Sequence, residues 1–216
     1  MFADLSPAMI AAAVVGGYVL GSIPFGVIVM RAAGAGDPRA IGSGSIGATN
    51  VLRSGRKGLA LLTVLGDGGK GALAVLIAWL ATRHGGVEAQ ATLTALAGGS
   101  AFFGHLFPVW LGFKGGKGVA TFFGTLLAAA WPVGIAAGAV WLLVAAVFRI
   151  SSLAGLTAAL AAPILALLLG RPLPVVVLAV VMAALIYIRH IPNIRRLLAG
   201  DEPRIGGSKA TADPTA

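Results

Sequence analysis

The sequence predicts an all-α polytopic membrane protein, and three features lead to that fold class. Of its 216 residues, 58% are apolar and only 11% are charged, and the mean hydropathy is +0.95. A soluble domain carries about 25% charged residues, so this chain has too few polar side chains to cover a globular surface. The third feature is a series of long apolar segments separated by short polar connections. Together these features argue against a soluble helical bundle.

Seven apolar segments are expected to form the membrane helices. They cover residues 8–30, 58–82, 91–112, 118–131, 132–148, 153–169 and 172–189. Crossing a bilayer takes about 20 residues, and because the last four segments are short, five spans are the alternative to seven. We expect one integral membrane domain over 1–200, followed by a polar tail over 201–216 that is disordered. Glycines such as Gly17 and Gly21, spaced four apart, are expected to let helices pack closely.

The basic residues are distributed unevenly over the connections, which predicts an orientation. If the N-terminus lies outside, 13 basic residues fall in the connections facing the cytoplasm, and Lys70 lies just inside a helix on that same face. Only Arg83 and Arg171 fall on the other face. This asymmetry fits the positive-inside rule with a cytoplasmic C-terminus. The net charge of +9 does not indicate a nucleic-acid partner, because no basic helix or aromatic platform is present.

The first polar cluster lies between two apolar segments, from Gly42 to Arg53. Its residues 42–47 match the pattern GxGxxG, but no strand precedes them, so a dinucleotide-binding fold is not indicated. Glycines permit close backbone approach to an anion, and an arginine can bind phosphate through two hydrogen bonds. The alternative is a flexible loop with a solvated arginine. The residues expected to contact substrate here are Gly42, Ser43, Gly44, Thr49, Asn50 and Arg53.

The second cluster precedes the fourth apolar segment. It is not a Walker A loop, because Gly118 follows Lys117 where a serine or threonine is required. It still places lysines and backbone amides at the start of a helix, whose positive dipole end favours an anion. The residues expected to bind substrate are Lys114, Gly115, Gly116, Lys117 and Gly118. For the lysines, the alternative is simple anchoring at the membrane surface, and His105 is either packed within the third segment or functional.

The third cluster ends the last apolar segment. His190 and Asn193 are three residues apart, so a continuing helix would place them on one face. Arg189 is expected to bind substrate, with positive-inside anchoring as the alternative. Asp67 and Lys70 begin the second segment, where a mutual ion pair and substrate contact are both open.

In this order, the motifs resemble those of the bacterial membrane acyl-phosphate:glycerol-3-phosphate acyltransferases, from Gly21-Ser22-Ile23-Pro24-Phe25-Gly26 to Glu202. The resemblance implies a multi-pass enzyme of the bacterial inner membrane with its site on the cytoplasmic face. It would transfer a fatty acyl group from acyl phosphate to the 1-position of glycerol 3-phosphate in phospholipid synthesis. It implies Ser43, Arg53, His190 and Asn193 as catalytic residues and the 115–118 loop for glycerol phosphate. Glu202 would be structural, and Ser45 stands where the family pattern has asparagine.

The chemistry implied by this resemblance needs little beyond two bound anions. Acyl phosphate is a mixed anhydride with a good leaving group, so the enzyme must orient the glycerol hydroxyl and stabilise charge. Either His190 or a substrate phosphate oxygen would take the proton, and we expect direct transfer. We expect no cofactor and no metal, since the seven acidic residues show no ligand spacing. Besides the two substrates, membrane lipids are the expected partners. The alternative function is a transporter of phosphate or an organic anion.

Overall fold

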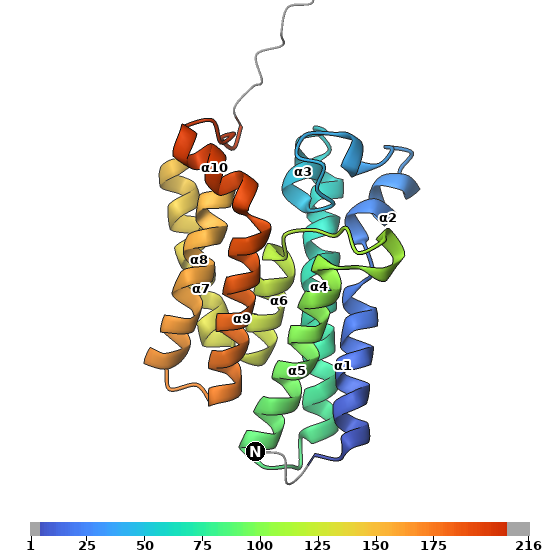
Figure 1. The fold of residues 1–216 in the computed structure, drawn as a ribbon, viewed down its shortest axis with the longest axis vertical. Helices are drawn as coiled ribbons and strands as arrows, with labels where there is room; N and C mark the ends of the chain where they lie inside the picture. Colours follow the sequence, from blue (N-terminus) through green and yellow to red (C-terminus); the bar gives the residue numbers. More distant parts are fainter. Residues whose placement is uncertain (1–4, 207–216) are drawn as a thin grey trace, which may run out of the picture.

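The structure, a computed structural model, describes residues 5–206 and consists of helices joined by short connections (Figure 1). This confirms the all-α fold class over the described range. The helices are α1 Pro7–Gly21, α2 Phe25–Ala32, α3 Ala48–Leu52, α4 Lys57–Thr82, α5 Val87–Leu106, α6 Val119–Ala129, α7 Trp131–Phe148, α8 Ser151–Leu168, α9 Leu173–Arg189 and α10 Ile191–Ala199, with short 3-10 turns η1 Pro38–Ala40 and η2 Val109–Leu111.

Each of the seven expected apolar segments corresponds to one helix: α1, which α2 extends, and α4 to α9. Four stretches within 5–206 are long and apolar enough to cross a membrane, namely Pro7–Ala32, Lys57–Thr82, Trp131–Phe148 and Ser151–Leu168. A fifth is possible if α9 and α10, which meet at a bend of 61°, form one broken span. α6 has only 11 residues, so at 1.5 Å per residue it is about 16 Å long. A multi-pass membrane protein is therefore supported, whereas the count of seven is not confirmed.

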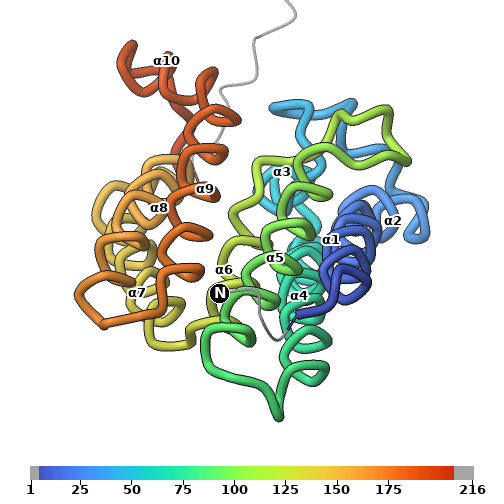
Figure 2. The backbone as a smooth tube through the Cα atoms, turned by 60° about the horizontal axis from the view of Figure 1, so that its bottom comes forward, coloured from blue at the N-terminus to red at the C-terminus, as the bar shows by residue number. Residues whose placement is uncertain are grey.

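The helices form two groups that α6 joins. α1, α4 and α5 lie side by side, and α7, α8 and α9 form the second group, as Figures 1 and 2 both show. The turns after α4 and after α8 lie at one end of the molecule. The other end carries α2, α3, the 107–118 connection and α10 (Figure 1). All three polar motifs are thus collected at one end.

Glycines allow two pairs of helices to touch backbone to backbone. A Cβ atom on Gly21 of α1 would lie 1.9 Å from the carbonyl oxygen of Ala101 on α5. A Cβ on Gly124 of α6 would lie equally close to the carbonyl oxygen of Gly68 on α4. A Cβ on Gly17 would likewise lie 2.5 Å from the Ala97 carbonyl oxygen. The predicted packing role of Gly17 and Gly21 is confirmed, and these contacts fix α5 and α6 against α1 and α4.

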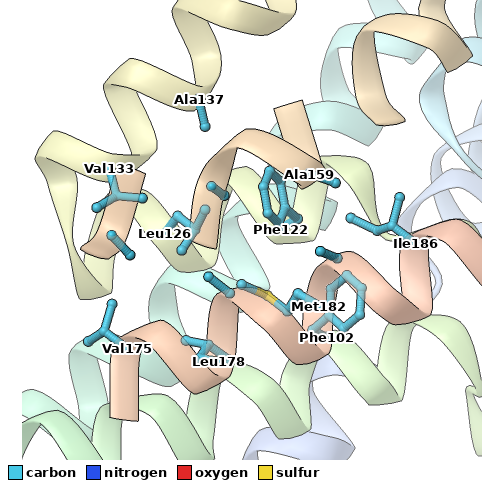
Figure 3. Packing of buried hydrophobic residues seen from close by; sticks show 14 of the residues in the cluster. Phe102, Phe122, Leu126, Val133, Ala137, Ala159, Val175, Leu178, Met182 and Ile186 are labelled. Atoms are coloured by element: carbon cyan, nitrogen blue, oxygen red, sulfur yellow. The ribbon is translucent and has the colours of Figure 1, made fainter. Parts of the chain in front are cut away.

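The largest apolar core lies between α6 and the second group of helices, with one side formed by α5. Phe122, Leu126 and Met182 are fully buried there, and Figure 3 shows their side chains pointing toward one another from facing helices. The cluster also includes Phe102 on α5 and Ile186 on α9. Because these residues lie close to the ends of α5, α6 and α9, the core sets the relative positions of the second and third motifs.

Candidate active site

The 115–118 loop turns back onto the end of α5 before α6 begins. The amide N–H of Gly115 donates to the carbonyl of Leu106, and that of Gly116 donates to the carbonyl of His105, both at 3.1 Å. Gly118 has φ +87°, and a Cβ there would lie 2.4 Å from the Phe102 ring. Glycine is required at these positions because the backbone follows α5 so closely. The amides of Gly115 and Gly116 are engaged by the protein itself, so they are not the free donors that the sequence suggested.

Arg189, at the end of α9, holds the same loop from the other side. Its Nε donates to the carbonyl of Gly116 at 3.1 Å, and its Nη2 donates to the carbonyl of Gly115 at 2.9 Å. The guanidinium also lies 5.6 Å from the centre of the Phe107 ring, within the range of a cation–π contact. The first visible role of Arg189 is therefore to fix the loop.

A network of side chains joins Lys117 to the third motif and to the segment that follows it. Lys117 Nζ donates to Asn193 Oδ1, and Asn193 Nδ2 donates to Glu202 Oε1. Glu202 also accepts from Ser152 Oγ and from Arg196 Nε, both at 2.7 Å. Asn193 and Glu202 are buried. Since Glu202 occupies the Nδ2 side of the Asn193 amide, the carbonyl oxygen must face Lys117.

The electrostatics of this network depend on burial and on the surrounding charges. Burial lowers the pKa of Lys117 to about 8; Glu202 opposes this shift, whereas Arg196, Arg53 and Arg189 add to it. Burial raises the pKa of the Glu202 carboxyl, but the hydrogen bonds from Asn193, Ser152 and Arg196 outweigh it, so this pKa lies below its ordinary value. At neutral pH the lysine is positive and the carboxylate negative.

His190 lies between α9 and α10 and is buried. Its Nδ1 is 2.8 Å from the carbonyl oxygen of Ile186. Because a carbonyl only accepts, Nδ1 carries the proton in this contact, and Nε2 is left as an acceptor in the neutral ring. Burial lowers the pKa of His190 to about 4, with the Ile186 contact opposing and Lys117 adding to the shift. The imidazole is thus neutral at pH 7, because its pKa lies below the ordinary value of a histidine.

Asn50 organises the first motif. Its Nδ2 donates to the carbonyls of Pro38, Ile41 and Ser45 at 2.6, 3.1 and 2.8 Å, and its Oδ1 accepts from the Ser43 amide at 2.9 Å. Gly42, with φ +52°, lies so close that a Cβ would be 2.4 Å from Asn50 Oδ1. Both ends of the buried Asn50 amide are therefore used in folding the loop.

The remaining first-motif residues lie on the surface of this loop. Ser43, Gly44, Thr49 and Arg53 are exposed. Thr49 Oγ1 lies 3.3 Å from Ser151 Oγ at the start of α8, so the first motif meets the second group of helices. Ser45 uses its Oγ to accept from the Gly47 amide, in keeping with a local structural role.

Three side chains that contact these residues were given no role from the sequence: Ser151 beside Thr49, and Ser152 and Arg196 on Glu202. The available signal was positional, because the connection over 149–152 was already assigned to the same face as the motifs. Lys114, in contrast, was expected to bind substrate, but it is exposed, and its side chain forms no hydrogen bond to any part of the chain between residues 5 and 206. The site therefore unites Lys117, Asn193 and the 115–118 loop and leaves Lys114 at its edge.

The fold and the site define a polytopic helical membrane protein. At one end it has glycine-shaped loops and a network in which a half-buried lysine contacts a buried amide and carboxylate. The chain belongs to the glycerol-3-phosphate acyltransferase family, whose model, described as "Glycerol-3-phosphate acyltransferase", matches residues 11–200. This agrees with the resemblance noted from the motifs.

Relatives of that name match over nearly the whole chain. The glycerol-3-phosphate acyltransferase of Caulobacter vibrioides is 64% identical over 91% of this chain and 88% of its own length. That of Rhodospirillum rubrum is 57% identical over 97% of this chain and 99% of its own length. The structure is similar to the crystal structure of PlsY, an integral membrane glycerol 3-phosphate acyltransferase, in its glycerol 3-phosphate form. The TM-score is 0.83, with 39% identity over 91% of this chain and 96% of the other. The lysophosphatidic acid form of that enzyme gives a TM-score of 0.80 with 38% identity.

Proposed function

We propose that this protein transfers a fatty acyl group from acyl phosphate to the 1-hydroxyl of glycerol 3-phosphate, giving 1-acyl-glycerol 3-phosphate. The observation that carries the proposal is the half-buried ammonium of Lys117, held by Asn193 beside the start of α6. A cation and a helix N-terminus together favour a phosphate. Family membership and the glycerol 3-phosphate form of the related crystal structure support this ligand. They favour an acyltransferase over the anion transporter considered from the sequence.

In this proposal Lys117 binds the phosphate of glycerol 3-phosphate, with Arg53 and Ser43 facing the same space from the first motif. The electrostatic influence of Arg53 on Lys117 supports this closeness. The amides of Gly115 and Gly116 shape the loop instead of donating to the substrate, so amides at the start of α6 are the candidates for direct contact. Asn193 sets the position of the ammonium.

The reaction then follows as a direct transfer. The 1-hydroxyl oxygen attacks the carbonyl carbon of acyl phosphate, a new ester C–O bond forms, the bond from that carbon to the phosphate oxygen breaks, and inorganic phosphate leaves. His190 Nε2, with its lone pair free in the neutral tautomer, accepts the hydroxyl proton. A phosphate oxygen of a substrate is the competing base. Positive charge from Lys117 stabilises the developing negative charge.

Replacing His190 with alanine is expected to lower kcat by about 10²- to 10⁴-fold, the usual contribution of a general base. The loss should persist at saturating glycerol 3-phosphate, because the change removes a proton acceptor rather than a phosphate contact. Steady-state kinetics on purified variants would measure it, with His84→Ala as control, since His84 is exposed in the turn between α4 and α5. A normal kcat would assign the base to a substrate phosphate.

The acyl donor is expected to be acyl phosphate and not acyl-CoA. Acyl phosphate brings a second phosphate anion that a basic site accommodates, and its phosphate is the leaving group. Incubation of purified protein with glycerol 3-phosphate and either acyl phosphate, acyl-CoA or acyl-carrier protein would measure product formation. Equal rates with acyl phosphate and acyl-CoA would overturn the donor assignment.

We further propose that all seven helices α1 and α4 to α9 cross the bacterial inner membrane, with the N-terminus outside and the site facing the cytoplasm. The chain has no cysteine, so single cysteines can report sidedness. We expect Arg56→Cys, exposed at the site end, to react with an impermeant thiol reagent only from the cytoplasm. Gly86→Cys, exposed in the turn after α4, should react from outside. The reverse pattern would refute this topology.

A further inference from the structure

Three buried polar side chains lie under the 115–118 loop and have no part in the chemistry described above. Asp67 and Lys70 on α4 and His105 on α5 are exposed by only 1%, 3% and 3%. Lys70 Nζ contacts Asp67 Oδ1 at 2.8 Å and donates to the carbonyl of Ile23 at 2.8 Å. Asp67 and Lys70 thus form the mutual pair that the sequence left as one of two alternatives.

The Asp67 oxygen that contacts Lys70 also faces His105. The Asp67 Oδ1 atom lies 3.5 Å from His105 Nδ1, and this nitrogen makes no hydrogen bond with any residue from 5 to 206. The carboxylate is therefore the group that orients the imidazole, by attraction to the Nδ1–H dipole. Ionisable side chains at this depth are costly, and an apolar trio of the same volume would fill the space at lower cost. Their presence calls for a function beyond packing.

His105 is also the member of the cluster that supports the loop. A Cβ on Gly116 would lie 2.3 Å from His105 Nε2, so the imidazole packs directly on this glycine. The carbonyls of His105 and Leu106 accept the amides of Gly116 and Gly115. A tilt of the imidazole would displace Gly116 and, because Lys117 is the next residue, would also move the Lys117 ammonium.

We propose that Asp67, Lys70 and His105 are positioning residues that set the height of the 115–118 loop, and with it the ammonium of Lys117. Asp67 fixes the plane of the His105 ring, and this ring packs against Gly116. Lys70 holds Asp67 in place and links it to the carbonyl of Ile23, between α1 and α2. Arg189 holds the same loop through its hydrogen bonds to the carbonyls of Gly115 and Gly116. The ligand that this loop receives, glycerol 3-phosphate, rests on the proposed function.

Four variants test the proposal. Asp67→Asn keeps the shape but weakens the hold on His105, and Asp67→Asn/Lys70→Met does so without leaving an unpaired buried lysine. His105→Gln removes the ring. Thr82→Val is the matched control, because it deletes a buried hydroxyl from the same helix, at the end of α4 far from the cluster. That hydroxyl forms hydrogen bonds only with carbonyls of α4 itself.

Two measurements are made on folded, detergent-purified protein. In hydrogen exchange, the peptide covering 113–118 should exchange about 10-fold faster or more in the three cluster variants, with α8 and α9 unchanged. In kinetics, kcat/KM for glycerol 3-phosphate should fall by about 10- to 100-fold, the effect of a misplaced binding group. The KM for acyl phosphate should change by less than about 2-fold. Thr82→Val should match the wild type in both measurements.

Three results would overturn the proposal. Unchanged exchange in 113–118 would remove the link between cluster and loop. Faster exchange throughout the molecule, seen also in Thr82→Val, would mean that the cluster contributes only to overall stability. Wild-type behaviour of the double variant would mean that Asp67 serves only to neutralise Lys70. The exchange measurement needs no turnover, so a wild-type protein that does not acylate glycerol 3-phosphate would refute the proposed function alone.

Discussion

Replacing Lys117 with alanine is expected to lower kcat/KM for glycerol 3-phosphate by about 10- to 150-fold. A hydrogen bond to a charged group contributes roughly 1.5–3 kcal/mol, and each 1.4 kcal/mol corresponds to a factor of about ten. The structure adds a second cause, because Asn193 Oδ1 loses the donor that faces it. If the contact is equally strong in the ground and transition states, the loss should appear mainly in KM.

Lys114→Ala is the matched control, since this lysine stands in the same connection but is exposed. It should stay within about 2-fold of the wild type, as expected of a screened surface charge. The lowered pKa of Lys117, about 8, gives a further readout. Lys117 is charged below that pH and neutral above it, so kcat/KM for glycerol 3-phosphate should decline as pH rises through 8. Unchanged kinetics in Lys117→Ala would refute the assignment of the phosphate site.

Replacing Glu202 with alanine is expected to cost about 1–3 kcal/mol of folding stability, the range for leaving buried polar groups without a partner, because Arg196 is 38% exposed and can be solvated. Ser152, Asn193 and Arg196 would all lose their acceptor. Enzyme activity should fall together with stability. Without Glu202, the Asn193 amide can rotate and place its NH2 group, which cannot accept a hydrogen bond, opposite the Lys117 ammonium. Thermal unfolding and steady-state kinetics in detergent would measure the two effects.

The neighbouring Asp201 provides the control for Glu202. It is exposed, and its side chain makes no hydrogen bond or ion pair to the rest of the 5–206 chain. Asp201→Ala should leave both stability and activity close to those of the wild type. If Glu202→Ala behaves like Asp201→Ala, the network does not hold the site together.

Much of the fold could be predicted because hydropathy and charge act along the chain. Each apolar segment contains a helix, and the glycines at 17 and 21 meet α5 as their spacing suggested. The bounds of α6, Val119–Ala129, lie close to the expected segment 118–131. The third segment was predicted less well, since it was expected over 91–112 but α5 spans Val87–Leu106. The chain leaves the helix after Leu106 and forms the 3-10 turn η2, although this stretch is as apolar as a helix interior.

The site was harder to predict, because the use of each polar group depends on contacts between distant segments. The sequence placed Lys117 and Asn193 in separate motifs, and it could not reveal that one donates to the other across 76 positions. Asn50 and the amides of Gly115 and Gly116 were assigned to the substrate, yet backbone atoms occupy them. In each case the backbone partner appears only when the loop is folded.

The expected polar tail shows a similar dependence on distant contacts. Residues 201–206 contact the rest of the chain through Glu202 and through Ile205, whose carbonyl accepts from Arg149 at 3.1 Å. Composition alone classifies this segment as polar and places it outside the domain. The rest of the expected tail, 207–216, lies outside the described residues.

The contact between Lys117 and Asn193 also bears on how strongly a phosphate can be bound. A lysine side chain gives up about 2 kcal/mol of rotamer entropy when it is fixed. Here the ammonium is already held by Asn193, which Glu202 orients in turn, so that loss occurs when the protein folds and not when a ligand arrives. Of its three N–H groups, only one is used by Asn193. An incoming anion therefore meets N–H donors that are already in place. The affinity of the Lys117 site for a phosphate thus depends on the rigidity of the site as much as on its charge.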